Sequence, residues 1–214
     1  MTTAAKNPFI VGLAFAAIGW LAPVASSATY DESILGDLSS VPAAPTAWTL
    51  ELGANGLIGS AGGNATSGPR DYDLVSFTIP AGLQLDSIIV NSYENEYEFG
   101  MSFFGLQAGS PWLDGLGLDI AGDFLMGWAH LEKFAPITDL LNEMHRLASE
   151  PAFAVPLPSG MYTLEIQDVD TVISYSLTFN VSAAVPEPAG MVMMVLGLVA
   201  ISLAGVRRRS RHVT

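Results

Sequence analysis

The sequence predicts a mainly β protein: a single β-sandwich of jelly-roll-like form with one short helix, flanked by an N-terminal signal helix and a C-terminal transmembrane helix. Three observations support this prediction. Segments in which apolar and polar residues alternate recur between turn-forming residues along the middle of the chain. Uncharged apolar runs occupy both ends. The middle, residues 29–182, is long enough to bury one sizeable core.

The composition excludes several classes of function. The 214 residues include no cysteine, so disulfides, cysteine-ligated metals and thiol nucleophiles are excluded. Acidic residues outnumber basic ones by 21 to 8, and residues 29–182 alone carry 20 acidic and 3 basic residues. Because binding to nucleic acid needs a basic surface, we expect no nucleic-acid partner.

The first 28 residues have the pattern of a secretory signal peptide. Lys6 makes the start basic, residues 9–21 are a continuous apolar run, and Ser26-Ser27-Ala28 supplies the small residues of a cleavage site. A helix over that run rises about 20 Å, which is less than the roughly 30 Å of a bilayer core. We therefore expect cleavage after Ala28, with the Sec translocon and signal peptidase as partners. A buried N-terminal helix is the alternative.

The C-terminal tail combines three features in a fixed order. Val185, Pro186, Glu187 and Pro188 come first, and residues 189–206 follow as 18 uncharged residues, just long enough to span a membrane. The arginine cluster of Arg207, Arg208, Arg209 and Arg211 comes directly after the span. Because arginines beside a span stay in the cytoplasm, we expect the N-terminal end of the span to lie outside. The prolines hold Glu187 in an extended stretch at that outer face.

Residues 185–211 closely resemble the PEP-CTERM sorting signal. The resemblance implies recognition in the inner membrane by an exosortase, an integral membrane cysteine protease-transpeptidase, and removal of the tail after about residue 188. It also implies a bacterium that has an outer membrane and makes exopolysaccharide, and export of the body through the periplasm to the cell surface or matrix. A plain single-pass anchor with a proline-bearing stalk is the alternative.

Seven or so short strands are predicted in the middle of the chain, as in a sandwich or barrel. They cover residues 48–52, 57–59, 74–79, 85–90, 97–105, 161–166 and 173–181. Residues 53–56 hold an Asn-Gly turn signal, and the Pro-Ala-Gly of residues 80–82 ends a strand. Residues 136–147 repeat apolar side chains at helical spacing, with Asp139 early and Arg146 late. They predict one short helix over an open end of the sandwich, with its apolar stripe in the core.

Short motifs in the middle resemble the bacterial pre-peptidase C-terminal type of β-sandwich. They are Tyr30-Asp31-Glu32 with Gly36-Asp37-Leu38-Ser39, Asp71-Tyr72-Asp73 before the strand that ends in residues 77–82, and the segments 159–167 and 174–177. The resemblance covers most of residues 30–182 but not the insert 106–153. It implies an accessory, non-catalytic module and does not fix a ligand.

The middle shows no catalytic motif, so we assign no catalytic residue and expect no enzyme. His130 and His145 lack partners at metal-ligand spacing. Carboxylates are the one dense chemical group, and Ca²⁺ prefers clustered oxygen ligands. The Ca²⁺ candidates are Asp71 with Asp73 and Asp168 with Asp170; no other cofactor is predicted. A solvated acidic surface is the alternative.

The sequence leaves three functions open. The first is a non-enzymatic surface or matrix protein that supports adhesion or matrix structure. The second is a module that binds extracellular carbohydrate or Ca²⁺, with Trp112 and Trp128 stacking on sugar rings; burial in the core is the alternative for each ring. The third and least favoured is a hydrolase that uses Glu94, Glu96 and Glu98, which share one face of an extended segment.

Overall fold

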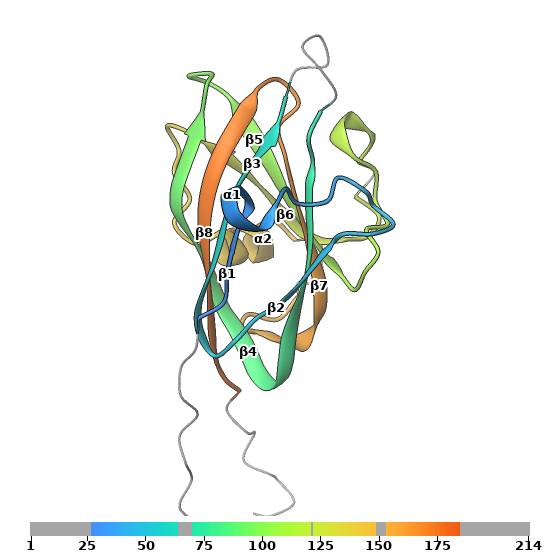
Figure 1. Cartoon of the computed structure of the whole chain (residues 1–214), viewed down its shortest axis with the longest axis vertical. Helices are drawn as coiled ribbons and strands as arrows, with labels where there is room; N and C mark the ends of the chain where they lie inside the picture. The colour runs from blue at the N-terminus through green and yellow to red at the C-terminus, as the bar shows by residue number, and fades with distance from the viewer. Residues whose placement is uncertain (1–26, 64–69, 121, 149–152, 185–214) are drawn as a thin grey trace, which may run out of the picture.

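The computed structural model describes residues 27–63, 70–120, 122–148 and 153–184. The chain is mainly β, as expected, with one open mixed sheet and two short α-helices (Figure 1). The strands are β1 (Thr29–Asp31), β2 (Thr46–Thr49), β3 (Gly53–Gly62), β4 (Asp73–Asn95), β5 (Met101–Ala108), β6 (Leu125–Glu132), β7 (Leu157–Gln167) and β8 (Val172–Ala183). The helices are α1 (Glu32–Leu35) and α2 (Leu140–Leu147), and η1 (Gly117–Asp119) is a 3₁₀ turn.

The sheet folds into two facing layers because β4 belongs to both. Residues 73–79 of β4 pair with β7, and residues 83–95 pair with β8. The strand order is β1-β3-β8-β4-β7-β5-β6, with β2 also on β4. One layer therefore holds β1, β3, β8 and the second part of β4, and the other holds β2, the first part of β4, β7, β5 and β6. The arrangement is sandwich-like, but it is one continuous sheet, and β1 and β2 pair in parallel with β3 and β4.

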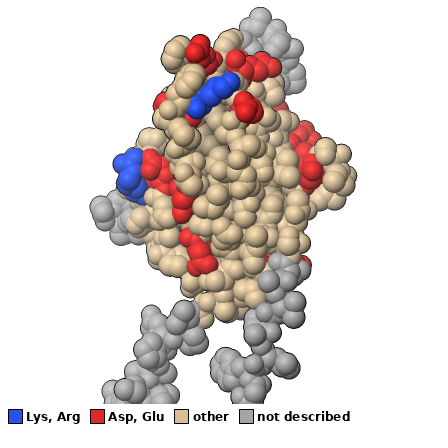
Figure 2. Space-filling model, turned by 90° about the vertical axis from the view of Figure 1, so that its left-hand side faces the viewer, with Lys and Arg blue, Asp and Glu red and all other residues tan. Residues whose placement is uncertain are grey.

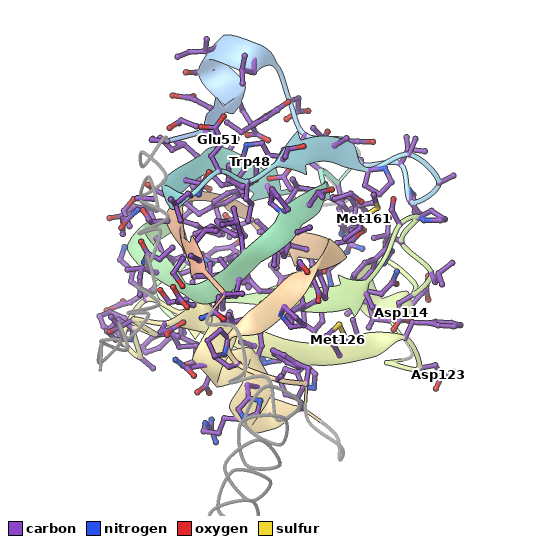
Figure 3. All side chains as sticks on the ribbon, turned by 90° about the horizontal axis from the view of Figure 1, so that it is seen from below. Trp48, Glu51, Asp114, Asp123, Met126 and Met161 are labelled. Carbon is purple, nitrogen blue, oxygen red and sulfur yellow. The ribbon has the colours of Figure 1, made fainter. Side chains whose placement is uncertain are left out.

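Aromatic side chains from the two layers meet in the core. The ring of Phe179 from β8 lies 5.3 Å from that of Phe77 in β4 and 5.2 Å from that of Trp48 in β2, centroid to centroid. The rings of Phe104 in β5 and Tyr175 in β8 also meet edge to face, with their centroids 6.5 Å apart. Figure 3 looks along the long axis and shows side chains filling the space between the layers, with Asp123 at the outer rim. These contacts hold the two layers of the sheet together.

Two turn predictions need correction. The Pro-Ala-Gly signal marks the bend inside β4 and not the end of a strand, and Gly82 adopts there a φ of 81°, which favours glycine. The Asn-Gly pair lies inside β3 and not in a turn. Asn55 is buried, its Oδ1 accepts from the Glu51 amide at 2.8 Å, and its Nδ2 donates to the Glu51 carbonyl at 2.8 Å. The asparagine thus braces the turn before β3 from within the strand.

Helix α2 confirms a helix with a buried stripe, but it begins at Leu140 and not near residue 136, and α1 is a second helix where only one was predicted. Helix α2 begins after Asp139, whose Oδ1 accepts from the amides of Leu141 and Asn142. Leu140, Leu141 and Met144 are fully buried against β6 and β4. Strand β6, which lies in the insert between residues 106 and 153, was not predicted.

A loop of residues 109–120, here called the strap, covers the outer face of the second layer. Thr163 Oγ1 donates to the Gly109 carbonyl at 2.6 Å, and Gln167 exchanges two hydrogen bonds with the backbone of Gly117. Trp112 on the strap is only 3% exposed. Polar side chains that point outward from β7 therefore fasten the strap and bury its tryptophan.

The predicted sorting tail and almost all of the predicted signal peptide lie outside the described residues. Strand β1 begins at Thr29, the residue after the predicted cleavage site. In the part of the chain that the structure describes, no helix is long and apolar enough to span a membrane. The predicted span 189–206 is not in that part.

Candidate metal centre

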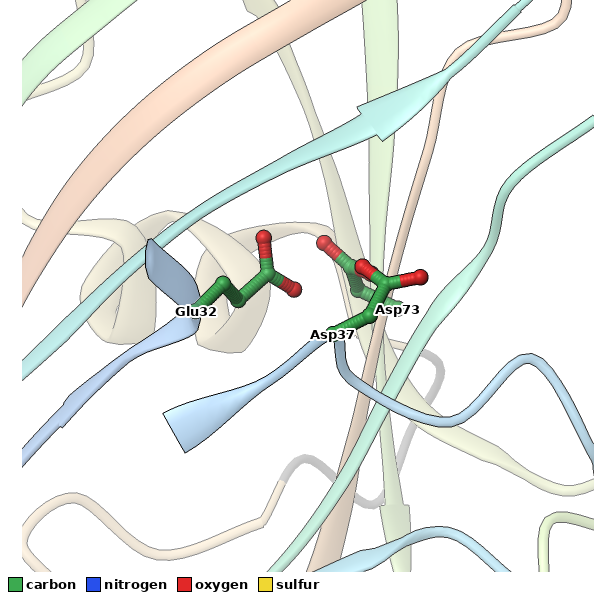
Figure 4. A group of neighbouring side chains, drawn as sticks. All are labelled: Glu32, Asp37 and Asp73. Carbon is green, nitrogen blue, oxygen red and sulfur yellow. The ribbon is translucent and has the colours of Figure 1, made fainter. Parts of the chain in front are cut away.

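Three carboxylates from separate segments converge beside β3. Glu32 comes from α1, Asp37 from the loop after α1, and Asp73 from the start of β4 (Figure 4). One oxygen of each lies within 4.8 Å of the others. We call these three residues the acidic triad. It is the feature of the described residues that best fits the predicted chemistry of clustered oxygen ligands.

Glu32 is fixed by backbone donors on both sides. Its Oε1 accepts from the Leu38 amide at 3.0 Å, and its Oε2 accepts from the Ser60 amide of β3 at 2.7 Å. Asp31 caps the short helix α1 by accepting from the Ser33 amide at 2.9 Å. Glu32 therefore holds residues 29–37, which we call the N-terminal segment, against β3. Its half-buried carboxylate has one defined position.

Gly59 of β3 permits the close approach of Glu32. A Cβ at this position would lie 2.7 Å from Glu32 Oε2 and 2.5 Å from the Tyr175 hydroxyl. Real Cβ atoms do not approach other atoms so closely, so a side chain here would displace one of the two groups. A glycine in the middle of a strand is thus explained by the carboxylate packed against it.

Asp73 is the buried member of the triad. It alternates with Val75, Phe77 and Ile79 along β4, so its side chain points between the layers. Its Oδ2 accepts from the Tyr175 hydroxyl at 2.6 Å, whereas its Oδ1 is buried and has no hydrogen-bond partner. Burial raises the pKa of Asp73 to about 9, and the charges of Glu32, Asp71 and Asp37 add to this against the opposing bond from Tyr175.

Among the described residues, no basic side chain neutralises the triad. Residues 29–182 contain three basic residues, all described and all engaged elsewhere. Lys133 pairs with Glu94, Arg146 pairs with Glu143, and the Arg70 guanidinium donates to the Val169 carbonyl. Three carboxylates this close repel one another unless a cation or a proton lies between them. A hard divalent cation such as Ca²⁺ fits this set of ligands, and the orphaned Asp73 Oδ1 would gain a partner.

Of the two aspartate pairs predicted to bind Ca²⁺, only one contributes a residue to the triad. Asp73 is in the triad, but Asp71 is not one of the three residues; its Oδ1 accepts from the Ser40 hydroxyl at 3.0 Å, and it acts on Asp73 through its charge. Asp168 is buried and already saturated. Its Oδ1 accepts from the amides of Asp170 and Thr171, and its Oδ2 accepts from Asn95 and Ser102. Asp168 therefore fixes the turn between β7 and β8, and Asp170 is exposed beside it.

The other candidate residues are not brought together into a site. Glu94, Glu96 and Glu98 are all exposed, and Glu96 accepts from the Thr171 hydroxyl at 3.1 Å. Trp112 belongs to the strap and its side chain is buried, and Trp128 stacks on Phe103 with an angle of 17° between the ring planes. His130 packs against these rings, and His145 Nδ1 lies 2.7 Å from the Phe153 carbonyl.

Sequence reasoning missed Glu32 and Asp37 as site residues. The parallel pairing of β1 with β3, which brings Glu32 beside β3, leaves no pattern in the sequence that would mark either residue. One signal was present: the alternation of Asp73 with three apolar residues places its carboxylate inside. A buried carboxylate calls for a nearby partner, and the other acids of the N-terminal segment were available.

Comparisons with protein-family models, curated proteins and solved structures found no match for this chain.

Proposed function

We propose that this chain is an exported, non-enzymatic protein of the cell surface or exopolysaccharide matrix, whose body binds one Ca²⁺ at the acidic triad. In this proposal an exosortase processes the tail after Pro186-Glu187-Pro188, and the body is a jelly-roll-like sandwich of the pre-peptidase C-terminal type. The two ends of the sequence support export and sorting. The single structural observation that carries the Ca²⁺ role is the buried, unpartnered Asp73 Oδ1 beside two further carboxylates.

A bound cation would join parts of the chain that are distant in sequence. Glu32 and Asp37 belong to the N-terminal segment, whereas Asp73 begins β4 and contacts Tyr175 of β8. A cation held by all three would pin the N-terminal segment onto the sandwich. Ca²⁺ is preferred over Mg²⁺ because it accepts irregular sets of six to eight oxygen ligands, whereas Mg²⁺ demands a near-ideal octahedron.

Calorimetry and thermal unfolding of the exported protein test the Ca²⁺ role. After removal of metals with EDTA, we expect binding of one Ca²⁺ and a rise in melting temperature. A concentration of 100 times Kd corresponds to about 2.7 kcal/mol of stabilisation. Asp37→Asn should weaken binding at least tenfold, because Asp37 is an exposed ligand whose change leaves the core intact. The matched control is Asp123→Asn, exposed at the rim (Figure 3). Absence of both heat and a melting shift at millimolar Ca²⁺ overturns the role.

Intact mass tests export and sorting. We expect the native protein from culture medium to begin near Thr29 and to end near residues 186–188. Detection of Arg207 in the exported protein overturns processing of the tail. A membrane-bound mass that reaches Thr214 would instead indicate a plain anchor.

A further inference from the structure

Two loops at one end of the molecule expose aromatic side chains. Phe99, in the loop between β4 and β5, is 87% exposed, Phe134 after β6 is 63% exposed, and Tyr97 is 54% exposed. This end lies opposite the one at which the first and last described residues are found (Figure 1). Turns normally consist of Gly, Asn, Asp, Ser and Pro, and each exposed ring forgoes about 25 cal/mol for every Å² of apolar surface left in water. A cluster of exposed rings is a kind of surface at which proteins bind partners.

Two of these rings, those of Phe99 and Phe134, contact each other although they come from distant parts of the sequence. The centroids of Phe99 and Phe134 lie 6.0 Å apart, with an angle of 48° between the ring planes. Both rings keep most of their surface open to solvent. We call Tyr97, Phe99 and Phe134 the aromatic tip.

Exposed carboxylates lie in the same two chain segments as the aromatic tip. Glu94, Glu96, Glu98 and Glu132 are all exposed in the same two chain segments. Lys133 Nζ lies 3.8 Å from Glu94 Oε2 and 3.5 Å from the Asn95 carbonyl, so one of these carboxylates already pairs with an ammonium group. Figure 2 shows acidic side chains gathered at the end of the molecule away from the chain ends. This surface is complementary in charge to a cation.

Open aromatic faces next to carboxylates recognise organic ammonium groups through cation–π and ionic attraction together. We propose that the aromatic tip binds a polysaccharide of amino sugars, whose protonated amines contact Glu96 and Glu98 while its sugar rings stack on Phe99 and Phe134. The ligand class rests on the proposed function, which brings the chain into contact with exopolysaccharide. The net charge of −17 on residues 29–182 disfavours acidic polymers and attracts cationic ones. A rigid sugar ring also loses less conformational entropy on binding than a lysine or arginine side chain of a basic peptide.

Binding of three probes to the exported protein tests this inference. The probes are glucosamine oligomers, N-acetylglucosamine oligomers of equal length, which keep the rings without the charge, and polylysine, which keeps the charge without the rings. We expect the glucosamine oligomer to bind at least tenfold more tightly than the other two and to weaken as NaCl is raised. The double variant Phe99→Ser, Phe134→Ser should lose at least tenfold in affinity. Leu118→Ser, which changes an 82% exposed residue of the strap, is the matched control and should bind as the wild type does.

Each other outcome overturns the inference. Equal or tighter binding of polylysine assigns the tip to a basic peptide, and equal binding of the acetylated oligomer removes the role of charge. Full affinity in the double variant removes the role of the rings, and absence of binding removes the site. Calcium binding measured on the same samples separates the proposals, because loss of sugar binding with Ca²⁺ binding retained leaves the proposed function standing.

Discussion

At Asp73, folding is coupled to proton binding when no cation is present. The pKa of its carboxyl is raised to about 9 by burial, whereas an unfolded aspartate titrates near 3.9. Between these values the folded state binds more protons than the unfolded state, so stability falls as pH rises through this window. The slope approaches about 1.4 kcal/mol per pH unit for one such group.

Urea unfolding at pH 5, 6, 7 and 8 in EDTA checks this prediction. We expect the free energy of unfolding to fall across the series, and Asp73→Asn, which is always neutral, to flatten the fall. Saturating Ca²⁺ should restore most of the stability of the wild type at pH 8 and little of that of Asp73→Asn. A pH profile that is identical in the wild type and in Asp73→Asn would show that Asp73 does not hold the proton.

Glu165 is a second buried acid, and it has no role in the triad. It lies on the outer face of β7 beneath the strap, is fully buried, and has no hydrogen-bond partner at either carboxyl oxygen. Burial, with the charges of Asp73 and Asp114, raises its pKa well above the usual range and so favours the neutral carboxyl. An apolar side chain of similar shape removes the cost of burying an unpaired polar group.

We therefore expect Glu165→Met to stabilise the protein by about 1–3 kcal/mol at pH 7. Glu165→Gln keeps the buried polar atoms and should stay within about 1 kcal/mol of the wild type. Urea unfolding of the three proteins gives the answer. Destabilisation by the methionine would contradict the unpaired state of the carboxyl.

At the scale of the elements, β3 lies between the N-terminal segment and the core, and Gly59 is the residue of β3 that packs against both Glu32 and Tyr175. Gly59→Ala would push a methyl group into Glu32 and the Tyr175 hydroxyl. We expect a loss of about 1–3 kcal/mol, typical of overpacking, and at least tenfold weaker Ca²⁺ binding because Glu32 is displaced. The control is Gly160→Ala in β7, where the added methyl meets the end of the Tyr162 side chain at 3.2 Å. Unchanged Ca²⁺ affinity in Gly59→Ala would argue against Glu32 as a ligand.

The strands that the sequence revealed are those with one buried and one polar face. Residues 74–79 and 173–181 alternate and lie inside β4 and β8, and the apolar stripe of α2 is buried as expected. Strand β6 was missed because Gly127 and Ala129 carry its buried face with little apolar bulk, and Gly127 fits closely against the Met144 carbonyl. The bend in β4 was read as an end because a glycine turn signal does not distinguish a sharp bend from a stop.

The candidate site could be predicted only in part, because only one of its three residues lies next to a segment with a periodic pattern. Asp73 was found because it stands beside a strongly patterned strand. Glu32 and Asp37 belong to a segment with no periodic pattern, and they are placed by the parallel pairing of β1 with β3 and by bonds to Leu38 and Ser60. Asp168 and Asp170 looked equivalent in sequence, yet the four donors that saturate Asp168 come from three chain segments.

At the scale of the whole molecule, the body is built to be independent of its ends. The first and last described residues lie at the same end (Figure 1), and β8 pairs with both β3 and β4 up to its last residues. Within the described part of the chain, the buried core residues lie between Leu38 and Val181. The proposed sorting requires a body that folds both before and after removal of the tail, and this arrangement would meet that requirement.

We therefore expect residues 29–184 to fold without the head and the tail. Because the core contacts are complete within these residues, the truncated chain should match the processed exported protein in melting temperature to within about 2 °C, which corresponds to less than 1 kcal/mol for a domain of this size. It should also bind Ca²⁺ with the same affinity, since all three triad residues are retained.

A further truncation to residues 38–184 removes Glu32 and Asp37 and tests the N-terminal segment. This shorter chain should lose Ca²⁺ binding and melt at a lower temperature, because β1 and the Glu32 clamp on β3 are gone. Equal melting temperatures for the two truncated chains would contradict the role of the N-terminal segment in holding the sandwich together.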